Sequence, residues 1–427
     1  MEKLILGNLT QRKIGYGIVQ PGNNIYSGVH VIKVYNIMAG LTKLSDLDLT
    51  ATEIEEKYSR TRLKGGELIV SIVGTIGKTA IVPKEFAGCN IVRAIALIDI
   101  KEEFLSLWTK YYIDSPKGQE YIKGNLNTTV QPTLNIKSLS NMPIPFYGTV
   151  YTKKAVNILS TIDNKIQLNK QINENLEQQA QALFKSWFVD FEPFKGGKFV
   201  DSELGMIPEG WRVGTFKDII HSTLSGDWGK ECKQGNHIQK VFCIRGADIP
   251  NIKRGDKGNM PTRFIIEKNF QSKALMDGDM VIEVSGGSPT QATGRACRIS
   301  RGLLDKYNHS IVCTNFCRAI KPLSQYSSFL YYMWEMFYNQ GIMFSYENGT
   351  TGIKNLDINR LIQKEPIIIP PVEIALEFEK ITQIYYEKIQ SNGVESEKLS
   401  QLRDTLLPRL MSGELAITDV DDRSIFQ

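Results

Sequence analysis

The chain has 427 residues, of which 42% are hydrophobic and 23% charged, and its formal net charge is +5. This length predicts two or three domains, and the composition is that of a globular protein rather than of a disordered chain. No apolar run approaches the ~18 residues of a membrane helix, and the N-terminal stretch MEKLILGNLTQRK lacks the apolar core of an export signal. Membrane and secreted proteins are therefore excluded, and we expect a cytoplasmic location.

Residues 1–150 are expected to form a first mixed α/β domain. Short β-type runs such as ELIVSIV and VRAIALIDI alternate with turn segments such as VQPGNN. The domain has 17 Lys and Arg against 13 Asp and Glu, so it is mildly basic. A basic surface favours a polyanionic partner, although a balance of this size is weak evidence alone.

Within this domain, VGTIGKT (Val73–Thr79) resembles a phosphate-binding loop, but the motif requires glycine where Ile72 stands. We interpret it as a glycine turn between strands. Glycines let a backbone approach DNA phosphates, and Thr75, Lys78 and Thr79 are candidates for bonds to phosphates or base edges.

The segment TTVQPTLNIKSL (Thr128–Leu139) has two interpretations. Its polar side chains, among them Gln131, are candidates for contacting nucleic acid. Alternatively, the segment forms a turn and a helix N-cap with a purely structural role, which we favour slightly.

Residues 151–205 are predicted to form a long helix and a linker. Apolar or amide residues recur every seven positions at Ile162, Asn169, Leu176 and Leu183. The helix ends in the aromatic segment LFKSWFVDFEPF, whose Phe184, Trp187 and Phe188 form either a core under a turn or an anchor for a partner subunit. We favour the anchor, because the end of a thin coiled coil offers little core.

Residues 206–370 are expected to form a second mixed α/β domain, with 21 Lys and Arg against 15 Asp and Glu. Its glycine turn, SGGSPTQATGR, offers Ser288, Gln291 and Arg295 for contacts to DNA, and Lys354 lies in a Thr- and Asn-rich turn. His309, Cys313 and Cys317 have a spacing that could bind a metal ion, but reduced thiols in apolar strands are the favoured interpretation, and no metal is expected.

Residues 371–427 are predicted to form a second long helix and a tail. Tyr385, Asn392, Leu399 and Leu406 repeat every seven positions, and all four are offset equally from their counterparts in the first helix. Such a repeat predicts an intramolecular coiled coil with an Asn at equivalent places, although each helix could instead pack on its own domain. Leu407, Leu410 and Met411, in LLPRLMSGEL, are further candidates for docking a partner.

The chain contains an internal repeat. TTVQPTLNIKSL, from Thr128, matches TTGIKNLDINRL, from Thr350, and KIQLN, from Lys165, matches KIQSN, from Lys388. VIKVYNI and GGELIV match CIRGADI and DGDMVI, and NIVRAI matches NFCRAI, so that Ile95 is equated with Ile320. Five blocks in one order indicate a tandem duplication of a domain followed by a helix. The helices should then pack antiparallel, with pseudo-twofold symmetry.

The sequence contains no GxSxG, HExxH, deaminase or GxGxxG signature, and no [DN]PP[YF] loop. The four histidines are not duplicated at matching positions. We therefore predict a non-catalytic chain. Two basic domains held by a rod suit binding at two places on DNA, and a coiled-coil scaffold that binds only proteins is the alternative.

With LFKSWFVDFEPF, LGMIPEGW and LLPRLMSGEL placed around two basic domains, nearly the whole chain resembles the specificity subunit of type I restriction-modification systems. GGELIVSIVGTIGKTAIV and VFCIRGADIPN are similar to the target-recognition domains of that family. Family members usually have an IPEGW-like segment before the first domain as well, and this chain starts without one.

The resemblance implies a fold, a function and partners. Two tandem target-recognition domains (1–150 and 206–370) would alternate with two conserved helices (151–205 and 371–427). Each domain would read half of a bipartite double-stranded DNA target, and the helices would set the spacer. The partners would be two DNA adenine methyltransferase subunits and restriction subunits, which would carry S-adenosylmethionine, ATP and Mg²⁺. A specificity module for another type of methyltransferase is the narrower alternative.

Overall fold

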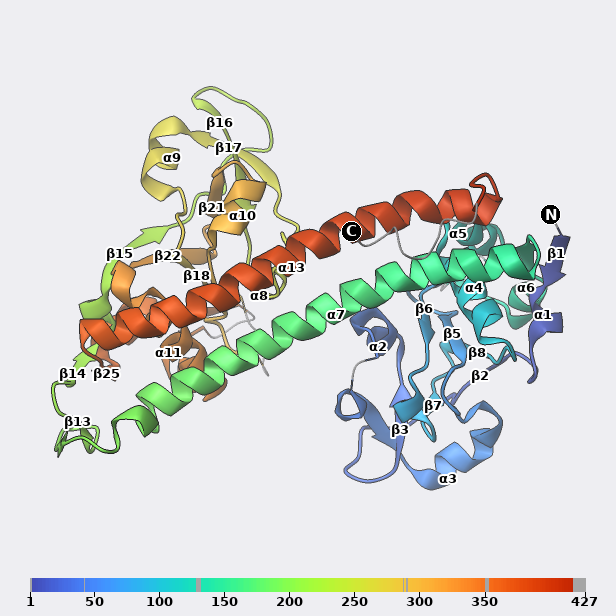
Figure 1. The fold of residues 1–427 in the computed structure, drawn as a ribbon, viewed down its shortest axis with the longest axis horizontal. Helices are drawn as coiled ribbons and strands as arrows, with labels where there is room; N and C mark the ends of the chain where they lie inside the picture. The colour runs from blue at the N-terminus through green and yellow to red at the C-terminus, as the bar shows by residue number, and fades with distance from the viewer. Residues whose placement is uncertain are drawn as a thin grey trace. The chain divides into compact units, whose positions relative to one another are not determined.

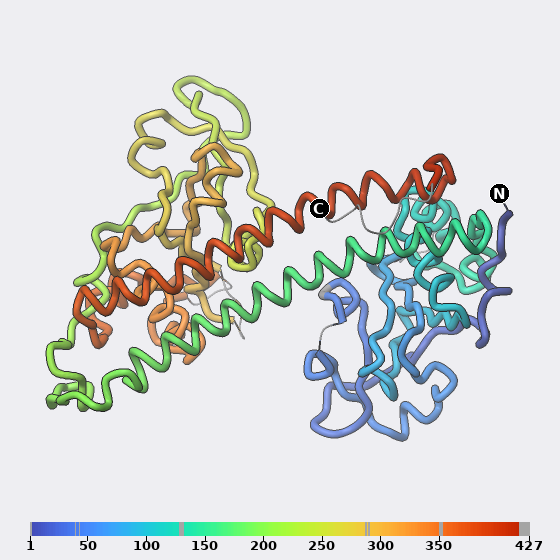
Figure 2. Tube along the Cα trace, in the orientation of Figure 1, coloured from blue at the N-terminus to red at the C-terminus, as the bar shows by residue number. Residues whose placement is uncertain are grey.

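The structure is a computed structural model that describes residues 2–41, 43–127, 132–286, 288, 291–349 and 353–417. The chain divides into two compact units, Met1–Asn164 with Leu399–Gln427, and Lys165–Lys398. Each unit holds one globular domain and part of both long helices (Figures 1 and 2). This grouping cuts across the four segments predicted from the sequence.

The first domain is built on two small sheets, in the strand orders β2-β8-β5-β6 and β4-β3-β7. Their strands are β2 (Gly15–Tyr16), β3 (Val29–Ile32), β4 (Asp48–Thr50), β5 (Leu68–Ser71), β6 (Thr79–Ile81), β7 (Asn90–Ile91) and β8 (Ile95–Ile98). Every residue of β5 and β8 is buried, which explains why both strands read as continuous apolar runs.

The described part of this domain also contains two strand pairs and six α-helices. The pairs are β1 (Glu2–Ile5) with β11 (Pro143–Phe146), and β9 (Leu126–Asn127) with β10 (Thr133–Leu134). The helices are α1 (Leu6–Leu9), α2 (Val34–Ala39), α3 (Thr52–Glu55), α4 (Glu103–Asp114), α5 (Pro116–Gly124) and α6 (Ile136–Ser140). Trp108 of α4 is fully buried and donates a hydrogen bond to the carbonyl of Pro145, so α4 packs under β11.

The second domain repeats this topology. Its sheets have the orders β15-β22-β18-β20, β17-β16-β21, β14-β25 and β19-β24-β23. The strands are β14 (Arg212–Thr215), β15 (Ile220–Ser225), β16 (His237–Ile244), β17 (Thr262–Ile266), β18 (Met280–Glu283), β19 (Ser285–Gly286), β20 (Ala296–Arg298), β21 (Ile311–Cys313), β22 (Cys317–Pro322), β23 (Glu347–Asn348), β24 (Lys354–Leu356) and β25 (Pro366–Ile369). In both domains one strand of the three-stranded sheet pairs parallel, β3 with β7 and β16 with β21. The duplication read from the sequence is thus visible in the strand pairing.

The helices of the second domain are α8 (Ile249–Lys253), α9 (Glu267–Lys273), α10 (Arg301–Lys306), α11 (Ser327–Asn339) and α12 (Ile358–Lys364). A short strand pair, β12 (Phe199–Val200) with β13 (Ile207–Pro208), precedes the domain. Asn135 and Asp357, which the repeat makes equivalent, cap α6 and α12 with their side chains. The structural interpretation of the two Thr-rich segments therefore holds for their described parts.

Strand register corrects one match of the repeat. Leu68 pairs with Ile98, and its counterpart Met280 pairs with Ile320. Ile320 therefore corresponds to Ile98, whereas matching NIVRAI to NFCRAI equated it with Ile95, so that match was wrong by three positions. Short apolar blocks resemble one another in several registers, whereas ladder hydrogen bonds fix a single one.

The two long helices are α7 (Thr149–Phe188, 40 residues) and α13 (Val372–Ser412, 41 residues). They pack antiparallel within each unit, where α7 is green and α13 red in Figure 1. In the first unit, Tyr151 donates to the carbonyl of Leu410, and Asp163 pairs with Arg403. In the second, Asn169 lies against Ser396, and Phe184 packs on Phe378. The predicted antiparallel coiled coil and α+β class are confirmed.

Two series of positions line the contact between the helices, and the seven-residue spacing in the sequence identified one of them. Of the predicted series, Ile162, Asn169 and Asn392 are buried, whereas Leu176, Leu183, Tyr385, Leu399 and Leu406 are half-buried. The other series lies three positions before it, and all of its members except the half-buried Arg403 are buried: Leu159, Ile166, Asn173, Ala180, Thr382, Ile389 and Ser396. Polar and small residues in this second series hid it from a search for apolar heptads.

Buried amides join the helices in the second unit. Asn169 donates to the Ser396 hydroxyl (3.2 Å), and Asn392 donates to the side-chain oxygen of Asn173 (2.8 Å). Because the repeat relates Asn169 to Asn392 and Asn173 to Ser396, the two bonds are equivalent. This reciprocity is the pseudo-twofold symmetry expected from the sequence.

The residues proposed as docking anchors lie in the cores of their own units, which corrects that prediction. Phe184 and Phe188 are each 2% exposed within an aromatic cluster that includes Trp211, Phe329 and Phe378, and Trp187 packs against its edge. Leu407, Leu410 and Met411 are buried with α4, β11 and the start of α7. The helix ends are wrapped by the globular domains, so a core is available that the sequence did not reveal.

The cysteines are free thiols, and most of them are buried. Cys232 is exposed, whereas Cys89, Cys243, Cys297, Cys313 and Cys317 are buried. His309 pairs with Asp305 rather than with the nearby thiols, and burial raises the pKa of the Cys317 thiol to about 11. These contacts agree with the favoured interpretation of reduced thiols in apolar strands.

The long helices are amphipathic rather than uniformly apolar. Among the described residues, no helix has both the length and the apolar character needed to cross a membrane.

Replacing Phe184 with alanine tests the corrected role of the aromatic cluster. The free energy of unfolding should fall by about 3–5 kcal/mol, the usual cost of removing a buried aromatic ring, as measured by chemical denaturation of the chain alone. Val189→Ala, at a 39% exposed position just after the end of α7, is the control and should change stability by less than about 0.5 kcal/mol. Equal stability of both variants would return Phe184 to the docking candidates.

Candidate nucleic-acid interface

In both domains a glycine-rich loop leaves the end of the central strand of the four-stranded sheet. We call residues 72–78, between β5 and β6, the first glycine loop, and the described residues of 284–295, between β18 and β20, the second. Ser71 ends β5 and Glu283 ends β18, and these two residues occupy equivalent places in the strand pairing. The two loops therefore start from the same point of a repeated frame.

Ser71 shapes the first glycine loop. Its fully buried hydroxyl donates to the carbonyl of Thr75 (2.6 Å) and accepts from the amide of Lys78 (2.8 Å), and the amide of Gly77 donates to the carbonyl of Ser71 (2.8 Å). These bonds fold the loop back on the strand end. The side chains of Thr75 and Lys78 are exposed at its surface, and Lys78 takes part in no ion pair with the described residues.

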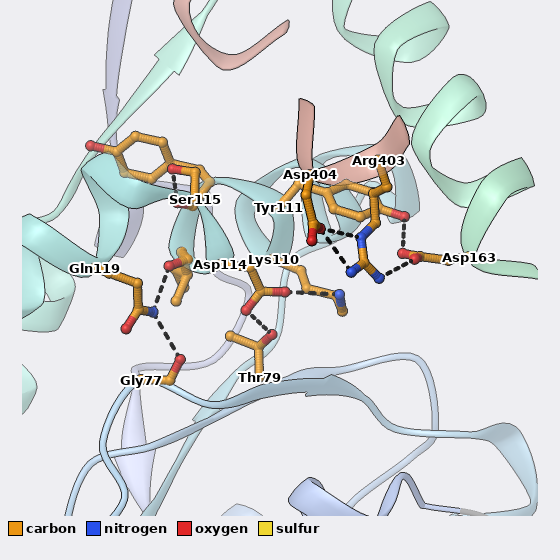
Figure 3. A network of polar contacts seen from close by, with 12 residues as sticks. Gly77, Thr79, Lys110, Tyr111, Asp114, Ser115, Gln119, Asp163, Arg403 and Asp404 are labelled. Carbon is orange, nitrogen blue, oxygen red and sulfur yellow. Dashed lines mark hydrogen bonds and ion pairs between the residues drawn. The ribbon is translucent and has the colours of Figure 1, made fainter. Parts of the chain in front are cut away.

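A polar network anchors the base of the first glycine loop on α4 and α5 (Figure 3). Thr79 donates to Asp114 (2.6 Å), which also pairs with Lys110 (2.9 Å). The amide of Gln119 donates to the carbonyl of Gly77 (3.0 Å). Thr79 thus helps hold the loop, and among the three candidates here only Thr75 and Lys78 are available to a ligand.

The same network extends to the long helices within the first unit. Tyr111 of α4 donates to Asp163 of α7 (2.9 Å), and Arg403 of α13 pairs with the other oxygen of Asp163 (3.0 Å), as Figure 3 shows. Burial raises the pKa of Tyr111, and the negative charge of Asp163 raises it further, so the phenol remains a donor. The first glycine loop is therefore connected to the helix pair through one helix, α4.

The second glycine loop is organised by an ion pair instead. Arg295 donates two hydrogen bonds to the buried carboxylate of Glu283, at 2.8 and 2.7 Å, and these bonds raise the pKa of Arg295. Gln291, with its amide oxygen turned toward Arg295, accepts from the same guanidinium at 2.9 Å, and its main chain pairs with Ser288. Arg295 is thus committed within the domain and is withdrawn as a free DNA contact.

The remaining candidates also differ from expectation. Lys354 pairs with Glu347 (2.9 Å) and lies over the ring of Phe344, so its charge is largely neutralised within the domain. Burial raises the pKa of Glu347, but bonds from Lys354 and Thr293 lower it below its usual value overall. Gln131 lies outside the described residues.

A pocket of about 410 Å³ opens beside the second glycine loop, at a place that no sequence pattern indicates. It is lined by Trp228, Arg245, Gly246, Ala247, Glu283, Ser285, Thr314, Asn315 and Phe316. The ring of Phe316 is 61% exposed, and Arg263 stacks on Trp228 at 3.8 Å. An exposed aromatic ring is suited to stacking on bases. Phe316 stands between Asn315 and Cys317 in a β-type stretch of the sequence, where a phenylalanine is usually interpreted as a core residue.

The position equivalent to Phe316 in the first domain is Ala94, and Asn315 corresponds to the exposed Arg93. Ile72 and Val284 donate to the carbonyls of Ala94 and Phe316 respectively, which establishes the correspondence. The two domains thus present different side chains from equivalent backbone positions, a Lys and an Arg in the first and an aromatic pocket in the second. Among the described residues, no group of three His, Cys, Asp or Glu gathers as a metal site.

Comparisons with known proteins identify the family. Residues 22–178 match the type I restriction modification DNA specificity domain. The chain is 30% identical over 329 residues to the specificity subunit of the type I restriction enzyme MjaIX of Methanocaldococcus jannaschii, covering 75% of this chain and 71% of the relative. The HindI specificity subunit of Haemophilus influenzae is 26% identical over 340 residues, which cover 66% and 71%.

The fold is also that of a solved structure, the type I restriction-modification S subunit from M. genitalium. The TM-score is 0.54, at 15% sequence identity, and the match covers 97% of this chain and 96% of the other. The chain therefore belongs to the specificity subunits of type I restriction-modification systems.

Proposed function

We propose that each globular domain of this specificity subunit reads one half of a bipartite double-stranded DNA target and that the paired helices set the spacer between the halves. The duplicated frame carries the proposal. Two domains of one topology present loops of different chemistry from equivalent strand ends, Ser71 in one and Glu283 in the other. A shared frame with different loops suits two different half-sites.

Phosphate contacts and base contacts would be divided among the exposed groups at these strand ends. Lys78 and Arg93 in the first domain carry charges that suit phosphates or the acceptor edge of guanine. In the second domain, Phe316 and Asn315 offer stacking and amide hydrogen bonds. Most of the affinity would then be salt-sensitive, with specificity added by fewer contacts.

The partners are proposed from the family. The chain itself would not be catalytic and would bind no cofactor. It would assemble with two DNA adenine methyltransferase subunits and with restriction subunits, which would hold S-adenosylmethionine, ATP and Mg²⁺. A scaffold that binds only proteins, or a specificity module for another type of methyltransferase, is the competing function.

Modified-base sequencing tests this function directly. DNA is taken from cells that express this chain with a cognate methyltransferase subunit, and from cells that express either protein alone. We expect N6-methyladenine in a two-part motif only when both proteins are present. Soluble, associated proteins without new methylation would favour the scaffold.

Substitutions of Lys78 and Arg295 distinguish a loss of DNA contact from a loss of domain stability. Lys78→Ala should weaken DNA binding by the assembled complex and reduce the slope of log K against log salt by about 1, with stability changed by less than about 0.5 kcal/mol. Arg295→Ala should instead lower the free energy of unfolding by about 3 kcal/mol, because it leaves the buried Glu283 carboxylate unpaired. Titrations at several salt concentrations and denaturation curves measure the two effects. The opposite pattern would show that the charged contact lies in the second loop.

Matched heptad insertions test whether the length of the paired helices sets the DNA spacer. One heptad is inserted in α7 between Asn164 and Lys165 and another in α13 between Lys398 and Leu399, the boundaries of the two units. At about 1.5 Å per residue the pair lengthens by about 10.5 Å, so the preferred spacer should grow by about 3 base pairs while both half-sites stay the same. Insertion in α7 alone, the control, breaks the antiparallel register and should abolish methylation. An unchanged spacer in the matched variant would show that the length of the helices does not set it.

A further inference from the structure

A glycine lies in the middle of α13, where the helix itself gains nothing from it. Glycine is the poorest helix former after proline, because its backbone loses the most freedom on folding. The repeat places Lys170 of α7 at the equivalent position, and that lysine is exposed. Gly393 is buried, so its surroundings in the second unit must explain it.

Gly393 touches the backbone of the second domain. A Cβ atom at position 393 would lie 2.0 Å from the carbonyl oxygen of Gly255 and 2.7 Å from its carbon. Conversely, a Cβ atom at Gly255, whose φ is +85°, would lie 2.5 Å from the carbonyl oxygen of Ile389 in α13. Main chain meets main chain here, so neither position has room for a side chain.

Polar contacts surround this approach. Asn173 of α7 donates to the carbonyl of Arg254 (2.9 Å) and to that of Ile389 (3.2 Å), while its own oxygen accepts from Asn392 (2.8 Å). One buried amide thus bonds to the second domain, to the main chain of α13 and to the amide layer between the helices.

Two lysines add charged contacts at the same place. Lys257 pairs with Glu397 of α13, and Lys306 of α10 donates to the carbonyl of Gly255 (3.4 Å). The loop 254–257, which follows α8, is therefore held against one point of the helix pair from several sides.

We propose that this contact of loop 254–257 with Asn173 and Gly393 is the positioning site that fixes the second recognition domain along the helix pair, and so contributes to the length of the DNA spacer. The inference rests on the proposed function. It adds that helix length alone does not set the spacer: the point at which the domain is attached does so as well. Because backbone contact demands glycine at 393, sliding the domain along the helix by one turn would place it against Ile389 or Glu397, whose side chains block the approach.

Gly393→Ala tests the proposal through the sign of its effect. In an exposed helix this substitution stabilises, but here the new methyl group would displace Gly255. We expect a melting temperature lowered by a few degrees. We also expect the purified complex with its methyltransferase subunit to lose at least tenfold of its preference among duplexes that differ only in spacer length, with both half-sites unchanged.

Asn173→Ala is the second variant, since it removes the two bonds to carbonyl groups, together with the bond from Asn392, without adding a clash. It keeps the test valid if Gly393→Ala fails to fold. Ser391→Ala, at an exposed position nearby on α13, is the control and should leave the spacer preference unchanged. Loss of methylation supports the proposal only if methylation returns on duplexes with another spacer. A wild-type preference in a folded variant, or a changed half-site with the same spacer, overturns it. Absence of methylation by the wild-type complex would instead reject the proposed function itself.

Discussion

The buried amide layer between α7 and α13 is the constraint on which the helix pairing depends. Asn169 meets Ser396 and Asn392 meets Asn173, in two bonds that the repeat makes equivalent. A buried amide without a partner costs about 1–3 kcal/mol. Sliding α13 by one heptad would place Ile389 or Arg403 opposite Asn169 in place of Ser396, so the alternative registers lose these bonds or bury a charge. The layer thus favours one register over its neighbours, at some cost in stability relative to an apolar seam.

Apart from the helix register, the two domains share one arrangement of paired strands and differ in the residues at the ends of those strands. The fully buried strands β5 and β18 are apolar up to their last residue in both copies, because burial on both faces leaves little choice. At the last residue of these strands the constraint ends. Ser71 bonds to the main chain of its own loop, whereas Glu283 binds a guanidinium, and the loops that follow differ in length and chemistry. A duplication can therefore keep its folding core while each copy acquires its own surface for recognition.

This frame could be predicted well from the sequence, because heptads and repeats are long-range patterns that a single chain displays. Prediction failed where the decisive partner is distant or the local pattern is ambiguous. Nothing near Phe184 indicates that Phe329 and Phe378 will enclose it, so its aromatic segment looked like an exposed anchor. Spacing likewise did not reveal that Arg295 would bond to Glu283 across a pair of adjacent strands. Lys78 could be found from the sequence, because a glycine turn marks its position. Phe316 could not, because a phenylalanine in a β-type stretch is usually interpreted as a core residue.

The net charge of each domain follows from the sequence, but the structure shows how many of the cations are already paired with carboxylates. By its balance of charged residues, the second domain attracts anions more strongly than the first. Yet among the described residues of the second domain, basic side chains lie within 4 Å of a carboxylate at ten positions: Arg212, Arg245, Lys253, Lys257, Arg263, Lys273, Arg295, Arg298, Lys321 and Lys354. In the described part of the first domain such pairs engage Arg12, Lys33, Arg62 and Lys110.

A cation that is already paired contributes little to binding phosphate, because the carboxylate beside it repels the incoming charge and separating the pair costs part of the gain. The number of unpaired cations is therefore a better guide to phosphate attraction than net charge. Under the proposed function, the first domain, with Lys78 and Arg93 exposed near its glycine loop, would rely more on electrostatic attraction. The second would depend more on shape, through the pocket beside Phe316. Two copies of one fold would then divide recognition by physical mechanism as well as by sequence.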